Sequence, residues 1–290
     1  MNYRISHRTV YEYDEPVTVS HHAARVEPRL TPFQTCSDWS LRILPEPAVR
    51  KTWIDYFGNR FCSFSIQEFH RRLEVVAECR VRIDPGLRPD PANSPAWEKV
   101  AATLLEPASP ETLDAQQFVF DSTHVRISPL LAELARPCFR PGRPLLEAVL
   151  DLNRHIHGEF TFDPEATTVA TPLEEVLERR RGVCQDFTHL ALGCLRSLGL
   201  AARYVSGYLR THQAPGRPRL VGADATHAWL AVFCPGFGWV DFDPTNNLMP
   251  RFEHITVAYG RDFADVSPVS GVITGGGEHR VNVGVDVVPV

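Results

Sequence analysis

The hydrophobic periodicity changes twice along this chain, and the order of the changes limits the fold. From Tyr3 to about Asp84, apolar residues alternate with polar ones in YRISHRTVYEY, WSLRILP, NRFCSFSI and RLEVVAECRVRI, as in half-buried strands. Helical spacing replaces this pattern between residues 145 and 198, and alternation returns in ARYVSGYLR, THAWLAVFC and GWVDFD. The sequence therefore predicts an α+β protein with an antiparallel β module at its N-terminus.

The length and the distribution of proline predict more than one structural unit. The chain has 290 residues, of which 43% are hydrophobic, so it exceeds the common size of a single domain. Prolines are frequent between Pro85 and Pro144, although aromatic and aliphatic residues persist there. We expect a β-rich unit at 1–84, a connector with short helices at 85–143, and a unit at 144–290 that ends in a further β segment.

Three helix signals lie in the third unit. Leu145, Val149, Leu152 and Ile156 share one helical face, and Gly158 provides a stop. The run TPLE at 171–174 predicts a new helix with a threonine N-cap, a proline in the first turn and a capping-box glutamate, ending near 181–182. Another apolar stripe begins at residue 184 or 185 and stops at 199, which predicts a second helix directly after the first.

Charge and composition exclude several classes of partner. The formal net charge is −5, so no general basic field would attract nucleic acid or an anionic membrane. The opening residues MNYRISHRTVYEYDE alternate instead of forming a secretory signal, and no run approaches the roughly 18 apolar residues of a membrane span. We expect a soluble, cytoplasmic protein without nucleic-acid or membrane partners.

One of the seven cysteines stands in a position that suits a nucleophile. The cysteines are scattered and include no CxxC pair, so they are expected to be individual thiols in a reducing compartment. Cys184 follows Gly182 and Val183 at the first turn of the predicted helix. Exposed backbone N–H groups and the helix dipole at such a place stabilise a thiolate and can also hold an oxyanion.

The strands that follow offer a base and an acid for this thiol. A cysteine nucleophile usually needs an imidazole, and strand alternation places His227 on one face with the bulky Trp229. An orienting carboxylate would then fix the imidazole. Asp241 and Asp243 in GWVDFDPT lie on the same face of the next strand, so spacing alone leaves the choice between them open.

Three runs in this order, RRRGVCQDFTHLA, ATHAWLAVF and GWVDFDPTNN, resemble the cysteine, histidine and aspartate motifs of the bacterial transglutaminase-like superfamily. The resemblance assigns Cys184 as nucleophile, His227 as base and Asp243 as the third member. It also implies a papain-like core, in which the cysteine helix packs on an antiparallel sheet. The runs YRISHRTVYEYDEPVTVS and DYFGN resemble the β-rich N-terminal domain of these proteins, and YGRDFADVSPVSGVITGGGEH resembles their C-terminal segment.

The remaining polar residues predict no further chemistry. His189 lies five residues along the helix from Cys184, points away from it and is expected to be structural. The backbone N–H of Cys184 is a better oxyanion donor than the Gln185 side chain. In animal transglutaminases a tryptophan upstream of the cysteine stabilises the oxyanion. The corresponding stretch here, GEFTFDP, offers only Phe160 and Phe162, which cannot donate a hydrogen bond. No histidine or cysteine set has metal-ligand spacing, so no metal or other cofactor is predicted.

The sequence therefore predicts an enzyme that forms a thioester at Cys184 from a peptide, isopeptide or glutamine-type amide. Water is the preferred acyl acceptor, because transfer to an amine requires a second binding site. One alternative is a catalytically silent binding or assembly module. A lesser alternative is an acyltransferase that uses a thioester donor, as arylamine acetyltransferases do. The partner would be a peptide or protein amide; the substrate itself and the oligomeric state are not predicted.

Overall fold

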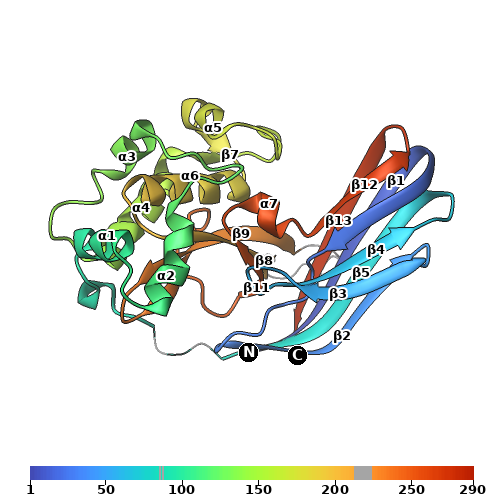
Figure 1. Ribbon diagram of the computed structural model, residues 1–290, viewed down its shortest axis with the longest axis horizontal. Helices are drawn as coiled ribbons and strands as arrows, with labels where there is room; N and C mark the ends of the chain where they lie inside the picture. The colour runs from blue at the N-terminus through green and yellow to red at the C-terminus, as the bar shows by residue number, and fades with distance from the viewer. Residues whose placement is uncertain (85, 87, 212–223) are drawn as a thin grey trace, which may run out of the picture.

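A computed structural model describes residues 1–84, 86, 88–211 and 224–290 of the chain. Figure 1 shows a broad sheet of long strands beside a helix-rich part that contains a second, smaller sheet, and both ends of the chain lie at the lower edge of the broad sheet. The predicted α+β class is confirmed. Among the described residues, no helix is long and apolar enough to cross a membrane.

The broad sheet is antiparallel and is organised around the first strand. Its members within the described residues are β1 (Asn2–Ala24), β2 (Gln34–Leu44), β3 (Val49–Ile54), β4 (Arg60–Ile66), β5 (His70–Ile83), β12 (Val269–Gly275) and β13 (His279–Pro289). The first half of β1 lies between β5 and β13, and its second half lies between β4 and β12. Alternate side chains such as Tyr3 and Ile5 are buried, which explains the period-two pattern.

Two features of this sheet differ from the sequence expectation. Strand β3 was not predicted, because all six of its residues are exposed and no alternation marks it. The C-terminal strands β12 and β13 were grouped with the third unit, at 144–290, yet both pair with β1, as in the β13 register of Tyr3 with Pro289 and Tyr13 with His279. The division at 84 and 143 stays a prediction, while the last strands belong to the N-terminal sheet.

Short helices follow strand β5 of the broad sheet. They are η1 (Pro91–Asn93), α1 (Trp97–Leu105), α2 (Pro110–Gln116), η2 (Gln117–Val119) and α3 (Pro129–Ala135). Buried Phe118 on η2 meets Trp239 of the smaller sheet edge-on, with ring centroids 5.2 Å apart. The connector therefore contributes to covering one face of that sheet.

The smaller sheet and its helices form the papain-like core. The elements are α4 (Leu145–Glu159), β6 (Thr161–Phe162), α5 (Leu173–Arg179), β7 (Arg181–Gly182), α6 (Cys184–Ser197), β8 (Ala202–Leu209), β9 (Ala225–Cys234), β10 (Gly238–Phe242), β11 (His254–Gly260) and α7 (Phe263–Val266). The sheet order is β10-β9-β8-β11, and every neighbouring pair is antiparallel. Helix α6 packs on one face, where Leu190 and Leu195 share a buried cluster with Leu230 and Val232.

The start of α5 differs from the prediction at its cap. Pro172 occupies the N-cap position and no side chain caps the helix. The Thr171 hydroxyl instead accepts a hydrogen bond from the Thr168 backbone N–H at 2.9 Å. The helix also ends earlier than predicted, at Arg179, because Arg180 adopts a left-handed conformation with φ of 50°. The run PGRP predicts a turn at residues 215–218, and this segment lies outside the described part of the chain.

The DYFGN run joins the N-terminal sheet to the core. Asn59 is fully buried and bonds strand β11 as a neighbouring strand would. Its Oδ1 accepts from the Tyr259 backbone N–H at 2.8 Å, and its Nδ2 donates to the Tyr259 carbonyl at 2.7 Å. The Asp55 carboxylate holds Asn59 through the side-chain amide and the backbone N–H. The resemblance of this run to the family therefore has a structural basis in the joint.

Candidate active site

Cys184 is the first residue of α6, as predicted, and its position is fixed by the chain before it. Strand β7 pairs in parallel with β6, and the Asp163 backbone N–H donates to the Gly182 carbonyl at 2.9 Å. The thiol is half-buried and packs against the main core. The first backbone N–H groups of a helix have no partner within that helix, so the N-terminus of α6 favours a negative charge on the sulfur.

Asp186 holds this helix start and was missed by sequence reasoning. Its Oδ2 accepts from the Val183 backbone N–H at 2.8 Å and from the Thr167 hydroxyl at 2.6 Å. Burial raises the pKa of Asp186, and these two hydrogen bonds oppose the rise. A side chain at Gly182 would come within 2.6 Å of this oxygen. A capping carboxylate three residues after the N-cap was the sequence signal.

His227 lies on β9 and faces both the thiol and the carboxylate. Its Nε2 is 2.8 Å from Asp243 Oδ2, which leaves Nδ1 for Cys184. Burial lowers the pKa of His227, but hydrogen bonds to Asp243 and to the Cys184 thiol outweigh it and raise the pKa to about 10. The imidazole therefore favours its protonated form at neutral pH.

Asp243 follows β10 and is fully buried. Its Oδ1 accepts from the backbone N–H groups of Thr245 and Asn246 at 2.9 and 3.1 Å. Its Oδ2 accepts a hydrogen bond from the side-chain amide of Asn246 at 2.7 Å. The same oxygen is hydrogen-bonded to the Nε2 atoms of His227 and His254, each at 2.8 Å. Burial raises the pKa of Asp243, but the two imidazoles outweigh it and hold the pKa well below its usual range.

The geometry separates the two aspartates that spacing could not. Asp243 bonds His227, whereas Asp241 pairs with Ala231 in the sheet and lies near the Arg203 guanidinium. Burial raises the pKa of Asp241, and Arg203 opposes the rise. Arg203 is itself held over the ring of Trp239 at 4.2 Å. Asp241 is thus part of the packing of the sheet face.

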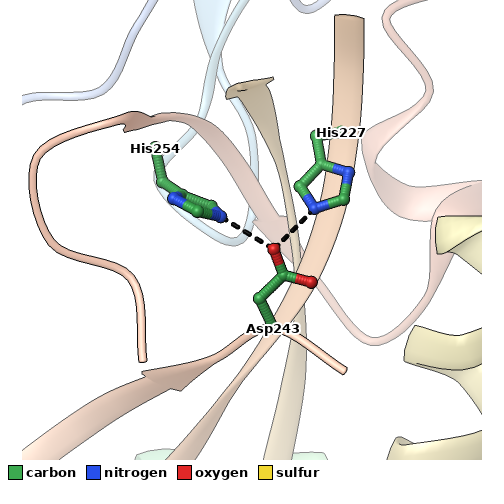
Figure 2. A group of neighbouring side chains, drawn as sticks. All are labelled: His227, Asp243 and His254. Atoms are coloured by element: carbon green, nitrogen blue, oxygen red, sulfur yellow. Dashed lines mark hydrogen bonds and ion pairs between the residues drawn. The ribbon is translucent and has the colours of Figure 1, made fainter. Parts of the chain in front are cut away.

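Figure 2 shows a second histidine that sequence reasoning did not find. His254 begins β11 and points at Asp243 from the side opposite His227. Fully buried Trp229 contacts both imidazoles: its ring centroid is 6.1 Å from that of His227 and 5.1 Å from that of His254. No local pattern marks His254, because it reaches the aspartate across β8 and β9. Asn246 was visible in the DPTNN run, but nothing there indicated its contact.

Within the described ranges, His227, Asp243 and His254 are the only group of His, Cys, Asp or Glu side chains with ligand spacing for a metal. Their ligand atoms lie within 4.8 Å of one another. Both imidazoles hydrogen-bond directly to one carboxylate oxygen at 2.8 Å, so they would have to separate from it to admit an ion. The arrangement fits a hydrogen-bonded relay better than a metal centre.

The other predicted residues lie outside this group. His189 is buried and stacks on His124, and its Nε2 accepts from the Phe263 backbone N–H at 3.2 Å, so it does not contact the thiol. Phe160 is buried while Phe162 is exposed.

Comparisons with known proteins agree with this picture. Residues 3–82 match the family model of the bacterial transglutaminase-like N-terminal region, and residues 132–244 match that of the transglutaminase-like superfamily. The chain is 42% identical to the uncharacterized protein Rv2569c of Mycobacterium tuberculosis over 296 residues, which cover 99% of this chain and 92% of the relative. It is 30% identical to a protein-glutamine gamma-glutamyltransferase of Pseudomonas aeruginosa over 122 residues, 42% of this chain and 18% of that protein.

The fold is shared with a solved structure along almost the whole chain. A crystal structure of a proposed cysteine protease from Cytophaga hutchinsonii superposes with a TM-score of 0.78 at 22% identity, covering 99% of this chain and 90% of that one. Its identity is low, so this likeness shows the fold. Together with the two family matches, it confirms the resemblance of the motifs: the chain belongs to the transglutaminase-like superfamily and carries the family's bacterial N-terminal region.

Proposed function

We propose that this chain is a cysteine hydrolase that forms a thioester at Cys184 from a peptide, isopeptide or glutamine-type amide. Membership of the transglutaminase-like superfamily supports a cysteine-dependent enzyme. The observation that carries the proposal is the order of three groups: Cys184 at the N-terminus of α6, His227 with a pKa that Cys184 and Asp243 both raise, and buried Asp243 at 2.8 Å from His227 Nε2. Such an order of nucleophile, base and orienting acid is what acyl transfer requires.

The first half of the reaction would use the proton held by His227. With its pKa raised to about 10, the imidazole keeps at neutral pH the proton that the Cys184 thiol gives up. The thiolate attacks the carbonyl carbon of the amide, and the backbone N–H of Cys184 donates to the developing oxyanion. His227 Nδ1 then gives its proton to the leaving nitrogen, so an amine or ammonia departs and the thioester remains.

The second half would return the site to its starting state. Neutral His227 takes a proton from water, and the hydroxide attacks the thioester carbonyl. The C–S bond breaks, the carboxylic acid is released, and the Cys184 sulfur again shares the proton with His227. Asp243 stays ionised throughout and holds the imidazole in place, since its pKa lies well below the usual range.

Water is proposed as the acceptor because hydrolysis needs no binding site for an amine. The Pseudomonas aeruginosa relative is by its name a protein-glutamine gamma-glutamyltransferase, so glutamine side chains belong among the donors to be tested. Ammonia release from a glutamine peptide should be the same with and without a primary amine. Incorporation of the amine faster than hydrolysis would assign the chain to crosslinking instead.

The proposal is tested by trapping the acyl-enzyme. Rapid acid quenching of the protein with a mixture of peptides, followed by mass spectrometry, should show an adduct on the Cys184 peptide. Cys184→Ala should lose the adduct. Cys36→Ala should keep it, because Cys36 is the other half-buried thiol and lies on β2 of the N-terminal sheet. No adduct from any amide or thioester donor, in the wild type, would contradict the proposal and favour a silent binding module.

The setting of the reaction is part of the same proposal. All seven cysteines are free thiols, which suits a reducing, cytoplasmic compartment. A net charge of −5 supports peptide or protein amides, rather than nucleic acid, as the partner.

A further inference from the structure

His254 occupies a place in the site that the proposed reaction does not use. Its Nε2 lies 2.8 Å from Asp243 Oδ2, the same oxygen that His227 Nε2 approaches at 2.8 Å. The His254 residue is only 8% exposed. Its imidazole thus makes a buried hydrogen bond to a charged group, which is among the stronger polar contacts in proteins.

The packing around His254 leaves its imidazole little freedom. The ring meets Trp229 edge-on at an interplanar angle of 88°. Gly207 of β8 lies directly opposite His227 in the sheet and beside Thr256 of β11. A Cβ on Gly207 would come within 2.4 Å of the Trp229 ring and 2.1 Å of the Ile255 carbonyl oxygen. The bare backbone of this glycine thus makes room for the ring that holds both imidazoles.

The contact from His254 differs in kind from the other contacts to Asp243. Thr245 and Asn246 belong to the same turn as the aspartate and move with it. His254 belongs to β11, which is the edge strand opposite β10 in the sheet. The χ2 torsion of an aspartate has a broad preference, so a donor from a separate, rigid element can fix the plane of the carboxylate.

We propose that His254 is a positioning residue, which fixes the Asp243 carboxylate from β11 so that His227 presents Nδ1 to Cys184. This inference rests on the proposed function and extends its three residues to a connected set of four. An uncharged imidazole with its hydrogen on Nε2 is sufficient, since Asp243 Oδ2 is the acceptor. His254 touches no reacting atom and acts through the aspartate.

The test measures the nucleophile without any substrate. Alkylation of Cys184 by iodoacetamide, resolved by peptide mass spectrometry, is followed across pH together with the NMR titration of the His227 ring. His254→Ala should slow alkylation at pH 7 by about tenfold or more and lower the pKa of His227. His254→Gln should recover most of the rate, because its side-chain amide can donate from nearly the position of Nε2.

A double-mutant cycle separates positioning from general packing. In an Asp243→Asn background, His254→Ala should slow alkylation no further, because the negative charge that His254 positions against His227 is gone. The matched control is His189→Gln. His189 is also a buried histidine, 4% exposed, but it lies on α6 and its Nε2 bonds the Phe263 backbone instead of Asp243. This control should leave the alkylation rate and the His227 titration unchanged.

The outcomes distinguish this inference from the proposed function. Wild-type Cys184 that is alkylated at the same rate as Cys184 in His227→Ala, at every pH, would overturn both. An activated wild-type thiol with His254→Ala unchanged, or with an equal loss in the Asp243→Asn background, would overturn the role of His254 alone. Loss in His254→Ala, recovery in His254→Gln and no further loss in the double mutant would support it.

Discussion

Replacing Asp243 with asparagine tests the electrostatics of the site most directly. The substitution keeps the size of the side chain but removes the charge that two imidazoles contact at 2.8 Å. In the wild type the pKa of His227 rises from 6.5 to about 10, with burial opposing the rise and Asp243 as the first group that overcomes it. Without the carboxylate, only Cys184 would still oppose the effect of burial, so the pKa of His227 should fall.

The size of the effect follows from this change. Each unit of pKa is worth 1.36 kcal/mol, so the rise to about 10 corresponds to about 5 kcal/mol in favour of the imidazolium. The equilibrium constant for proton transfer from Cys184 to His227 changes tenfold for each unit of the His227 pKa. Cys184 contributes part of the rise, so a loss of the whole rise, which would reduce the thiolate–imidazolium pair at pH 7 by roughly 10³-fold, is the upper limit for Asp243→Asn.

The assay is the pH dependence of iodoacetamide alkylation at Cys184, with an NMR titration of His227 in parallel. Asp241→Asn is the matched control, because it removes a carboxylate from β10 two residues before Asp243, and no hydrogen bond joins Asp241 to His227 or His254 among the described residues. Asp243→Asn should be alkylated at neutral pH far more slowly than wild type, and Asp241→Asn at the wild-type rate. If the two variants behaved alike, or if Asp243→Asn kept the wild-type profile, the assignment of Asp243 would be wrong.

Three further predictions concern the same region. Gly207→Ala places a Cβ within 2.1 Å of a backbone oxygen, so thermal unfolding should show a loss of about 1–3 kcal/mol together with reduced amide cleavage; unchanged stability would refute this steric argument. Asp186→Ala removes the acceptor for the Val183 N–H and should cost about 1 kcal/mol in a urea titration, whereas Asp186→Asn should retain most of that stability. Amide cleavage should decline as the pH passes about 10, where His227 loses its proton. The protonated His227 stabilises the folded state fully below pH 6.5, and this stabilisation is lost as the pH rises to about 10. A difference in unfolding free energy between wild type and His227→Ala that stayed constant from pH 6 to 10.5 would contradict the raised pKa.

Local sequence patterns predicted the elements of this protein better than their contacts. Alternation and helical spacing gave most of the strands and helix α6 beginning at Cys184, because burial on one face leaves a direct record in the sequence. Strand β3 left none, since all six of its residues are exposed. The prediction that Thr171 caps α5 was wrong, because the Thr171 hydroxyl accepts from the Thr168 backbone N–H instead of from a backbone N–H of the helix. Both partners are local in sequence, so the pattern alone did not distinguish them.

The candidate site was predictable only as far as its residues lie in order along the chain. Alternation put Asp241 and Asp243 on the same face, and the chain turns immediately after the second one. Backbone N–H groups at Thr245 and Asn246 then point into the Asp243 carboxylate, which a strand at 241 cannot provide. The family motif selected Asp243 without this reason, and the turn supplies it.

His254 shows what no local pattern could supply. Its contact with Asp243 depends on the order β10-β9-β8-β11 and on the absence of a side chain at Gly207, between the strands that carry the two histidines. Three elements with separate packing thus meet at one carboxylate oxygen. Under the proposed role of His254, a substitution in β11 should change the protonation of His227, and with it the reactivity of the Cys184 thiol, without contacting either residue.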